Sequence, residues 1–143
     1  MFKTILLPID LSAPASWTKA LPVAMDLVKA SGGSLHVLTV VPDFGLSVVG
    51  SFFDEGFEEK ALHKVGEDLT DWVNEQVPAS IDVHPHVTHG RVYEMILEAA
   101  DKLDANAIIM ASHTPELSDY LLGPNAARVV RHAKQSVFVV RED

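Results

Sequence analysis

Short apolar runs alternate along the whole chain with stretches in which apolar residues recur at helical spacing. The predicted strands cover residues 5–9, 35–41, 81–87, 107–111 and 137–140, and the predicted helices cover residues 17–28, 57–77, 92–103 and 126–133. This alternation implies right-handed crossovers and a parallel sheet with helices on both faces. Because no linker or change of composition interrupts it, the sequence predicts a single-domain α/β fold over residues 1–143 with an open five-stranded sheet.

The apolar character of the predicted strands indicates where a ligand would bind. The two most apolar internal runs end at Ile9 and Met110 and should form the central pair, with pairing of the first expected to stop near Pro8. The run 81–87 alternates apolar with polar residues and is expected at one edge, and the last strand is expected at an edge as well. In an open sheet of this kind, ligands bind beyond the carboxyl ends of the strands, where the winding direction reverses. The site is therefore expected between the loop after the first strand and the segment 111–125.

The acidic balance of the chain limits its partners. The 143 residues carry a formal net charge of −9 at pH 7 with no Lys/Arg-rich run, so nucleic acid and membrane surfaces are disfavoured. The chain has no cysteine, which excludes disulfides and thiolate chemistry and suits a reducing compartment. No long apolar stretch or cleavage site precedes the first predicted strand, so a cytoplasmic location is expected.

The segment after the fourth predicted strand carries the strongest functional signal. Small and polar residues follow Met110 and lead, through a further loop, to Gly123 just before a helix. Backbone N–H groups and the positive end of the helix dipole both favour an anion there, so the layout is that of a phosphate site. On spacing alone a second interpretation stays open, in which Gly123 and Pro124 only shape the start of the helix.

Several segments of the chain resemble one known family. The stretch Ala111-Ser112-His113-Thr114-Pro115, the later stretch Tyr120-Leu121-Leu122-Gly123-Pro124-Asn125, the opening 2–10 and the close 136–141 are all similar to the universal stress protein family. The similarity spans the chain and is greatest to the branch that includes the enterobacterial F and G types.

The resemblance implies a fold and a function. The fold would be the adenine-nucleotide alpha-hydrolase-like one, and the protein would be a cytoplasmic stress-response regulator that forms a homodimer or tetramer. It would bind ATP or another adenine nucleotide, with or without Mg²⁺. Since family members are chiefly regulators, at most a slow ATPase is expected, and no catalytic residue or metal site is assigned.

The resemblance also implies which residues hold the nucleotide. The family motif has Gly, two residues, Gly, nine residues, then Gly and Ser or Thr. It falls here on Ala111, Thr114, Gly123 and Pro124, with eight residues rather than nine between Thr114 and Gly123. Asp10 matches the acidic residue that ends the first strand. The positions assigned to nucleotide binding are Pro8, Ile9, Asp10, Val40, Met110, Ala111, His113, Thr114, Gly123, Pro124 and Asn125.

The phosphate side of this motif is altered. Ala111 and Thr114 each place a Cβ where glycine would let the backbone approach a phosphate. Pro124 has neither a hydroxyl nor a backbone N–H, so two donors toward a terminal phosphate are absent. Because a charge-assisted hydrogen bond contributes roughly 1.5–3 kcal/mol, losing one would weaken triphosphate binding by about ten- to a hundredfold. These substitutions equally suit an interaction module that has lost the nucleotide and works through its oligomeric surface.

Other polar residues have two interpretations each. Asp10 either bonds a ribose hydroxyl or holds Mg²⁺ through water, or it caps the turn that follows it. His113 lies in the crevice loop, but no base-and-nucleophile arrangement accompanies it, so it is not assigned as catalytic. His84, His86 and His89 suggest a metal site, although a solvated strand face is favoured because a fourth ligand is not evident.

Overall fold

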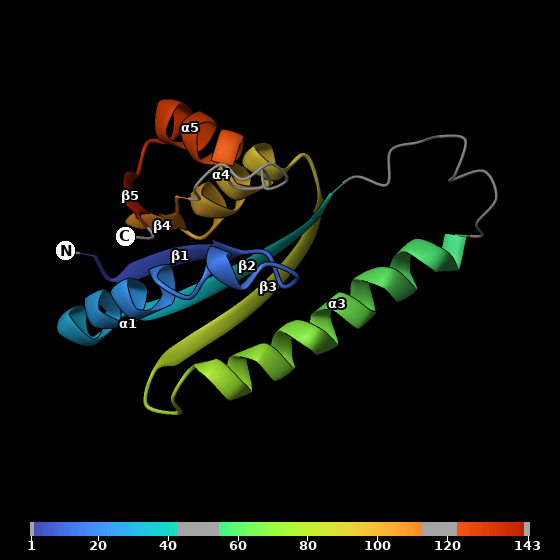
Figure 1. Cartoon of the computed structure of the whole chain (residues 1–143), viewed down its shortest axis with the longest axis horizontal. Helices are drawn as coiled ribbons and strands as arrows, with labels where there is room; N and C mark the ends of the chain where they lie inside the picture. The colour runs from blue at the N-terminus through green and yellow to red at the C-terminus, as the bar shows by residue number, and fades with distance from the viewer. Residues whose placement is uncertain (1, 43–54, 113–122, 142–143) are drawn as a thin grey trace.

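Five parallel strands form one open sheet in the computed structural model, which describes residues 2–42, 55–112 and 123–141 (Figure 1). The strands are β1 (Thr4–Ile9), β2 (Ser34–Pro42), β3 (Asp82–Gly90), β4 (Ala107–Ala111) and β5 (Ser136–Val140). Their order is β3-β2-β1-β4-β5, with every neighbouring pair parallel. The predicted fold class is confirmed, as are the central pair β1 and β4 and the two edge strands.

Helices cover both faces of this sheet. They are α1 (Ala20–Ser31), α3 (Glu55–Gln76), α4 (Val92–Lys102) and α5 (Gly123–His132), with a short 3₁₀ turn η1 (Pro14–Ser16) ahead of α1. Apolar residues of α1 and α3 pack on one face and those of α4 and α5 pack on the other, forming two separate cores. Figure 1 shows the same division, with α3 running along the β3 side of the sheet.

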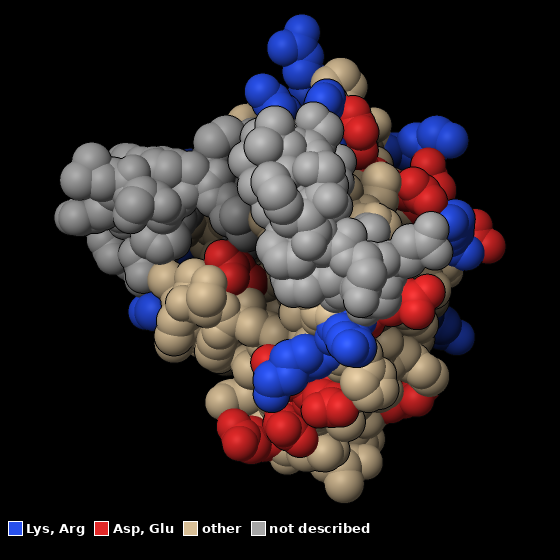
Figure 2. Space-filling view, turned by 90° about the vertical axis from the view of Figure 1, so that its right-hand side faces the viewer, with Lys and Arg blue, Asp and Glu red and all other residues tan. Residues whose placement is uncertain are grey.

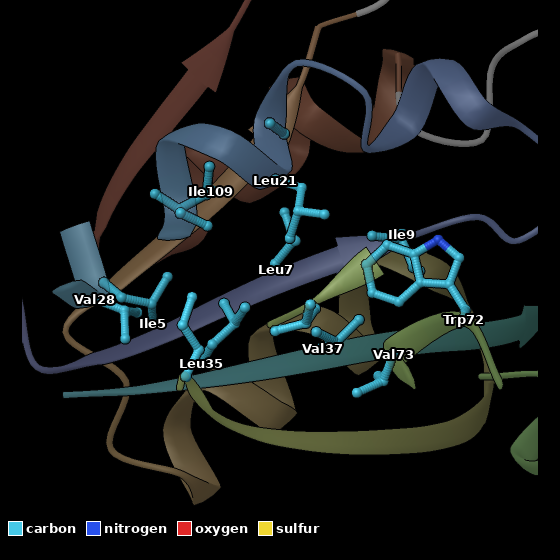
Figure 3. Close-up of a cluster of buried hydrophobic side chains, with 14 of the residues drawn as sticks. Ile5, Leu7, Ile9, Leu21, Val28, Leu35, Val37, Trp72, Val73 and Ile109 are labelled. Atoms are coloured by element: carbon cyan, nitrogen blue, oxygen red, sulfur yellow. The ribbon is translucent and has the colours of Figure 1, made fainter. Parts of the chain in front are cut away.

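The two central strands supply apolar residues to both cores. Leu7 and Ile109 face α1 and α3, while Leu6 and Ile108 face α4 and α5, and all four side chains are fully buried. Figure 3 shows the first of these cores, in which Leu7 lies among side chains from β2, α1 and α3. Burial on both faces is the reason that these strands read as continuous apolar runs.

The boundaries of several elements differ from the sequence-based expectations. Helix α5 begins at Gly123 rather than at residue 126, because proline is readily accommodated in a first helical turn and Pro124 therefore does not delay the helix. Helix α1 begins at Ala20 rather than at residue 17, because the chain first forms η1. Strand β3 continues to Gly90, where the expectation ended it at residue 87.

Pro8 does not end the pairing of β1 as expected. The register with β2 continues through Pro8↔Leu38 to Ile9↔Thr39. The register with β4, in contrast, holds only Ile5↔Ala107 and Leu6↔Ile108. The expectation was therefore wrong on the β2 side, whereas on the β4 side pairing ends even before the proline, which has no N–H to donate.

The turn between α1 and β2 packs tightly against the backbone just before β1. Gly32 has a φ of 68°, which ends α1 in the left-handed conformation that suits glycine. A Cβ on the next residue, Gly33, would collide with the backbone of Lys3. Ser34 then donates its N–H to the Lys3 carbonyl at 2.7 Å, which begins the β1–β2 ladder.

We expect Gly33→Ala to lower the free energy of unfolding by about 1–3 kcal/mol, because the added Cβ must displace the backbone of Lys3. The matched control is Gly66→Ala on α3, where a Cβ would meet no atom within 4 Å and alanine favours the helix by roughly 0.5–1 kcal/mol. Urea denaturation measures both. A neutral Gly33→Ala variant would contradict this close approach.

Candidate functional site

The direction of winding reverses between β1 and β4. From β1 the chain proceeds outward through β2 to β3, and it then returns to the other side of β1 to form β4 and β5. The two strands pair only near their amino ends, at Ile5↔Ala107 and Leu6↔Ile108. Beyond these pairs no β1–β4 register joins them, so the switch point predicted from the sequence opens toward their carboxyl ends.

The described residues of the predicted site gather at this end of the sheet. Asp10 follows the last residue of β1, and Ala111 is the last residue of β4. Gly123, Pro124 and Asn125 form the first turn of α5, the helix that follows β4. Asp10 and Ala111 therefore lie at the carboxyl ends of adjacent strands, as the sequence predicts. His113 and Thr114 lie outside the described residues.

A hydrogen-bonded turn fixes the loop after β1. Oδ1 of Asp10 accepts hydrogen bonds from the N–H of Ser12 at 3.0 Å and from its hydroxyl at 2.7 Å. The N–H of Asp10 donates to Oγ of Ser16 at 2.9 Å, and the Asp10 carbonyl accepts from the N–H of Ala13 at 2.9 Å. This geometry matches the turn-capping interpretation of Asp10, and it fixes the carboxylate just beyond the carboxyl end of β1.

The apolar positions of the predicted site are buried and face different sides of the sheet. Val40 and Met110 belong to the core under α4 and α5, whereas Ile9 belongs to the core under α1 and α3. Pro8 is buried as well. The side chains of Ile9, Val40 and Met110 therefore belong to the packed cores beneath the carboxyl ends of the strands.

Charges are mixed over the face that Figure 2 shows, where acidic and basic side chains are interspersed rather than separated by sign. Basic residues do occur in α5, which has Arg131 and His132 in its last turn. Arg128 of the same helix lies over the ring of Tyr93, 5.2 Å from the centroid. Arg131 lies at the negative end of the α5 dipole, where a positive charge is favourable, and the positive end lies at Gly123.

A cluster of histidines that the sequence did not predict lies at the β2–β3 edge. Sequence reasoning grouped His84 and His86 with His89, but the structure places His84 and His86 against His36 of β2. Nδ1 of His36 lies 2.8 Å from Nε2 of His86. No group of three or more metal-ligating side chains among the described residues is arranged to hold a metal ion. The alternate spacing of residues 84 and 86 predicted that these two histidines share one face of a strand. The β2–β3 register, which brings His36 beside them, could not be predicted from that spacing.

Comparison with known proteins identifies the family. The model of the universal stress protein family matches residues 1–141. Universal stress protein G of Escherichia coli O157:H7 is 32% identical over 143 residues, which covers 99% of this chain and 100% of the relative. The chain belongs to the universal stress protein family, as the sequence resemblance predicted.

Solved structures agree on the fold. A universal stress family protein from Burkholderia pseudomallei has a TM-score of 0.72 at 22% identity, covering 97% of this chain and 96% of its own. A universal stress protein solved in complex with cAMP has a TM-score of 0.64 at 18% identity, covering 99% of this chain and 98% of its own.

We expect Asp10→Ala to lower the free energy of unfolding by about 1 kcal/mol, since it removes the acceptor for both donors of Ser12. Asp10→Asn keeps an acceptor oxygen and should stay within about 0.5 kcal/mol, as should Asp26→Ala on the exposed side of α1. Urea denaturation measures the free energy of unfolding of each of these variants. Equal losses in the Asn and Ala variants would show that charge, rather than the turn geometry, sets the contribution of Asp10.

Proposed function

We propose that this protein is a cytoplasmic stress-response regulator that binds an adenine nucleotide in the crevice between β1 and β4. The observation that supports the proposal is the absence, among the described residues, of β1–β4 register pairs beyond Leu6, at the switch point whose strands are followed by Asp10 and, further along the chain, by α5. The family membership and the cAMP complex of one structural neighbour support a nucleotide as the occupant.

The chemistry of the borders suits a nucleotide. The first turn of α5 presents backbone N–H groups and the positive end of a dipole, both of which favour a phosphate. Asp10 supplies carboxylate oxygens for ribose hydroxyls, or for Mg²⁺ through water. Ala111 at the end of β4 and Pro124 in α5 reduce the close contacts and donors available to a terminal phosphate. The proposed site therefore favours a monophosphate or diphosphate over a triphosphate.

We expect titration calorimetry to detect binding of AMP, ADP or ATP, with or without Mg²⁺, and Asp10→Asn to weaken it without loss of stability. Asp10→Asn removes the charge and one acceptor but preserves the turn that Ser12 closes. Asp26→Ala is the control that should leave binding unchanged. Absence of heat with all three nucleotides would rule out the proposal.

We expect Pro124→Ser to tighten ATP binding by about ten- to a hundredfold, because it restores a hydroxyl and a backbone N–H at the start of α5. AMP binding should change much less, since the restored donors face the distal phosphates. Pro78→Ser, located after α3, serves as the matched control. Equal effects of Pro124→Ser on ATP and AMP would place the phosphates elsewhere.

The oligomer in this proposal is a homodimer formed through β5. This edge strand is apolar, and Val139 is 37% exposed. An exposed apolar edge is a site for pairing with another chain, so a second copy would cover it. No helix of the described residues is long and apolar enough to span a membrane.

We expect Val139→Lys to convert the dimer to a monomer, because the substitution places a charge in the apolar edge. Glu75→Lys, at the exposed end of α3, adds the same side chain away from β5 and should leave the dimer intact. Sedimentation velocity measures both. Dimers of unchanged stability in Val139→Lys would exclude β5 as the interface.

A second function is favoured by the substitutions in the phosphate motif. Ala111, Thr114 and Pro124 all remove features that hold a nucleotide phosphate, and a protein with these changes can act through its oligomeric surface alone. This alternative predicts normal dimerisation without nucleotide binding. A weak ATPase is the third possibility, and it predicts phosphate release that Asp10→Asn abolishes.

A further inference from the structure

Three histidines from two neighbouring strands meet on one face of the sheet. The register of β2 and β3 places His36 opposite His84, and Leu38 opposite His86. Nδ1 of His36 and Nε2 of His86 are 2.8 Å apart, and their rings are inclined by only 21°. His84 also stacks with His36, with centroids 4.8 Å apart. The edge strand β3 is thus tied to β2 by side chains as well as by the backbone ladder.

Little negative charge surrounds this histidine cluster (His36, His84 and His86). Asp82 is the acid on β3, and its Oδ1 pairs with Nε2 of His84 at 3.0 Å. On β1, the residue beside His36 is the buried Leu6.

Among the described residues, the remaining charges on this face come from α4, which packs against β2 and β3. Helix α3 also packs against β3, but on the opposite face of the sheet. Glu98 and Lys102 of α4 line the same cavity as His86, but they pair with each other at 2.8 Å. On β2, Oγ of Ser34 lies 3.4 Å from Nε2 of His36. A second positive charge in the cluster would therefore be poorly compensated.

The contact between His36 and His86 depends on protonation. In the neutral pair, one facing nitrogen carries a hydrogen and the other offers a lone pair. A first added proton can occupy an outer nitrogen and leave this bond intact. A second proton places hydrogens on both facing nitrogens, which makes the contact repulsive. The bond therefore requires that at least one of the two rings stay neutral.

Burial keeps these rings neutral near pH 7. Burial is the largest of the causes that lower the pKa of His36 to about 4, and the charges of His86 and His84 lower it further. Burial, followed by the charge of His84, also lowers the pKa of His86. Because the ordinary pKa is about 6.5, the unfolded or detached strand binds protons more readily than the folded one. The neutral cluster therefore makes its full contribution to the stability of the attached strand above about pH 6.5, and this contribution is lost as the pH falls toward about 4.

We propose that the histidine cluster is an acid-operated latch that holds edge strand β3 on β2 when neutral and releases it when both facing rings are protonated. Strand β3 is suited to such release because it lies at the edge of the sheet and pairs with β2 alone.

Release of β3 would open an existing cavity. A space of about 260 Å³ lies between β3 and α4, next to His86. Its apolar lining includes Leu38 of β2 and Met95 of α4. Detachment of β3 at low pH would expose this lining. A partner protein or a dye that binds apolar surfaces could then bind there.

Amide hydrogen exchange tests the latch. We expect the protection of residues 82–90, corrected for intrinsic exchange, to fall by up to roughly a hundredfold per pH unit between about pH 6 and 4, since up to two protons, one on each facing ring, are linked to opening. Protection of β1 and β4 should persist over this range. Simultaneous loss of protection in all strands would indicate global unfolding and overturn the proposal.

Two variants separate the latch from general acid sensitivity. His36→Phe keeps a ring of similar size but cannot be protonated, so β3 should remain protected at pH 4.5. His63→Gln is the matched control, because His63 is exposed on α3 and pairs with Glu67 at 2.9 Å, so the acid response should remain. Acid opening in His36→Phe equal to that of the unmodified protein would overturn the proposal.

Titration of the unmodified protein by NMR provides a test that needs no variant. The imidazole signals of His36 should report a pKa well below 6.5, and β3 amide signals should change with the same midpoint. A His36 midpoint near 6.5, or loss of β3 protection at pH 7 on adding a metal chelator, would contradict the latch.

Discussion

The burial of β1 and β4 on both faces determines the rest of this structure. Each strand sends alternate apolar side chains into two cores, so neither can lie at an edge without exposing them. Parallel neighbours then require crossover helices, which must be distributed over both faces to cover the sheet. With β1 and β4 adjacent, the chain winds outward in opposite directions from them, and the switch point follows.

In this arrangement the proposed nucleotide site combines buried strands with polar groups from the segments that follow them. The floor consists of buried strand ends, while the polar groups come from the turn after β1 and the start of α5. Substitutions at the borders can therefore alter phosphate recognition without disturbing either core. Ala111 and Pro124 are changes of this kind, since one ends a buried strand and the other is compatible with a first helical turn. The fold accommodates both residues, and in the proposed site their effect would fall on contacts with the phosphates.

Local sequence patterns predicted the fold more completely than the site. The strand order and the edge positions follow from which runs are apolar throughout and which alternate. The start of α5 was predicted too late in the chain because Pro124 can either precede a helix or occupy its first turn. The pairing of β1 continues past Pro8 on the β2 side and stops before it on the β4 side. The presence of a proline in the sequence does not predict this difference between the two neighbouring strands. The histidine cluster depends on the register that sets His36 beside His84, and register is a tertiary property.

The central claim is that the crevice between β1 and β4 holds an adenine nucleotide. Mass spectrometry of the small molecules released when the purified protein is denatured tests it most directly. We expect an adenine nucleotide in the released fraction, mainly AMP or ADP because of the substitutions on the phosphate side, and much less of it from Asp10→Asn. A purified protein that releases no nucleotide, and that takes up none when incubated with AMP, ADP or ATP beforehand, would contradict the account.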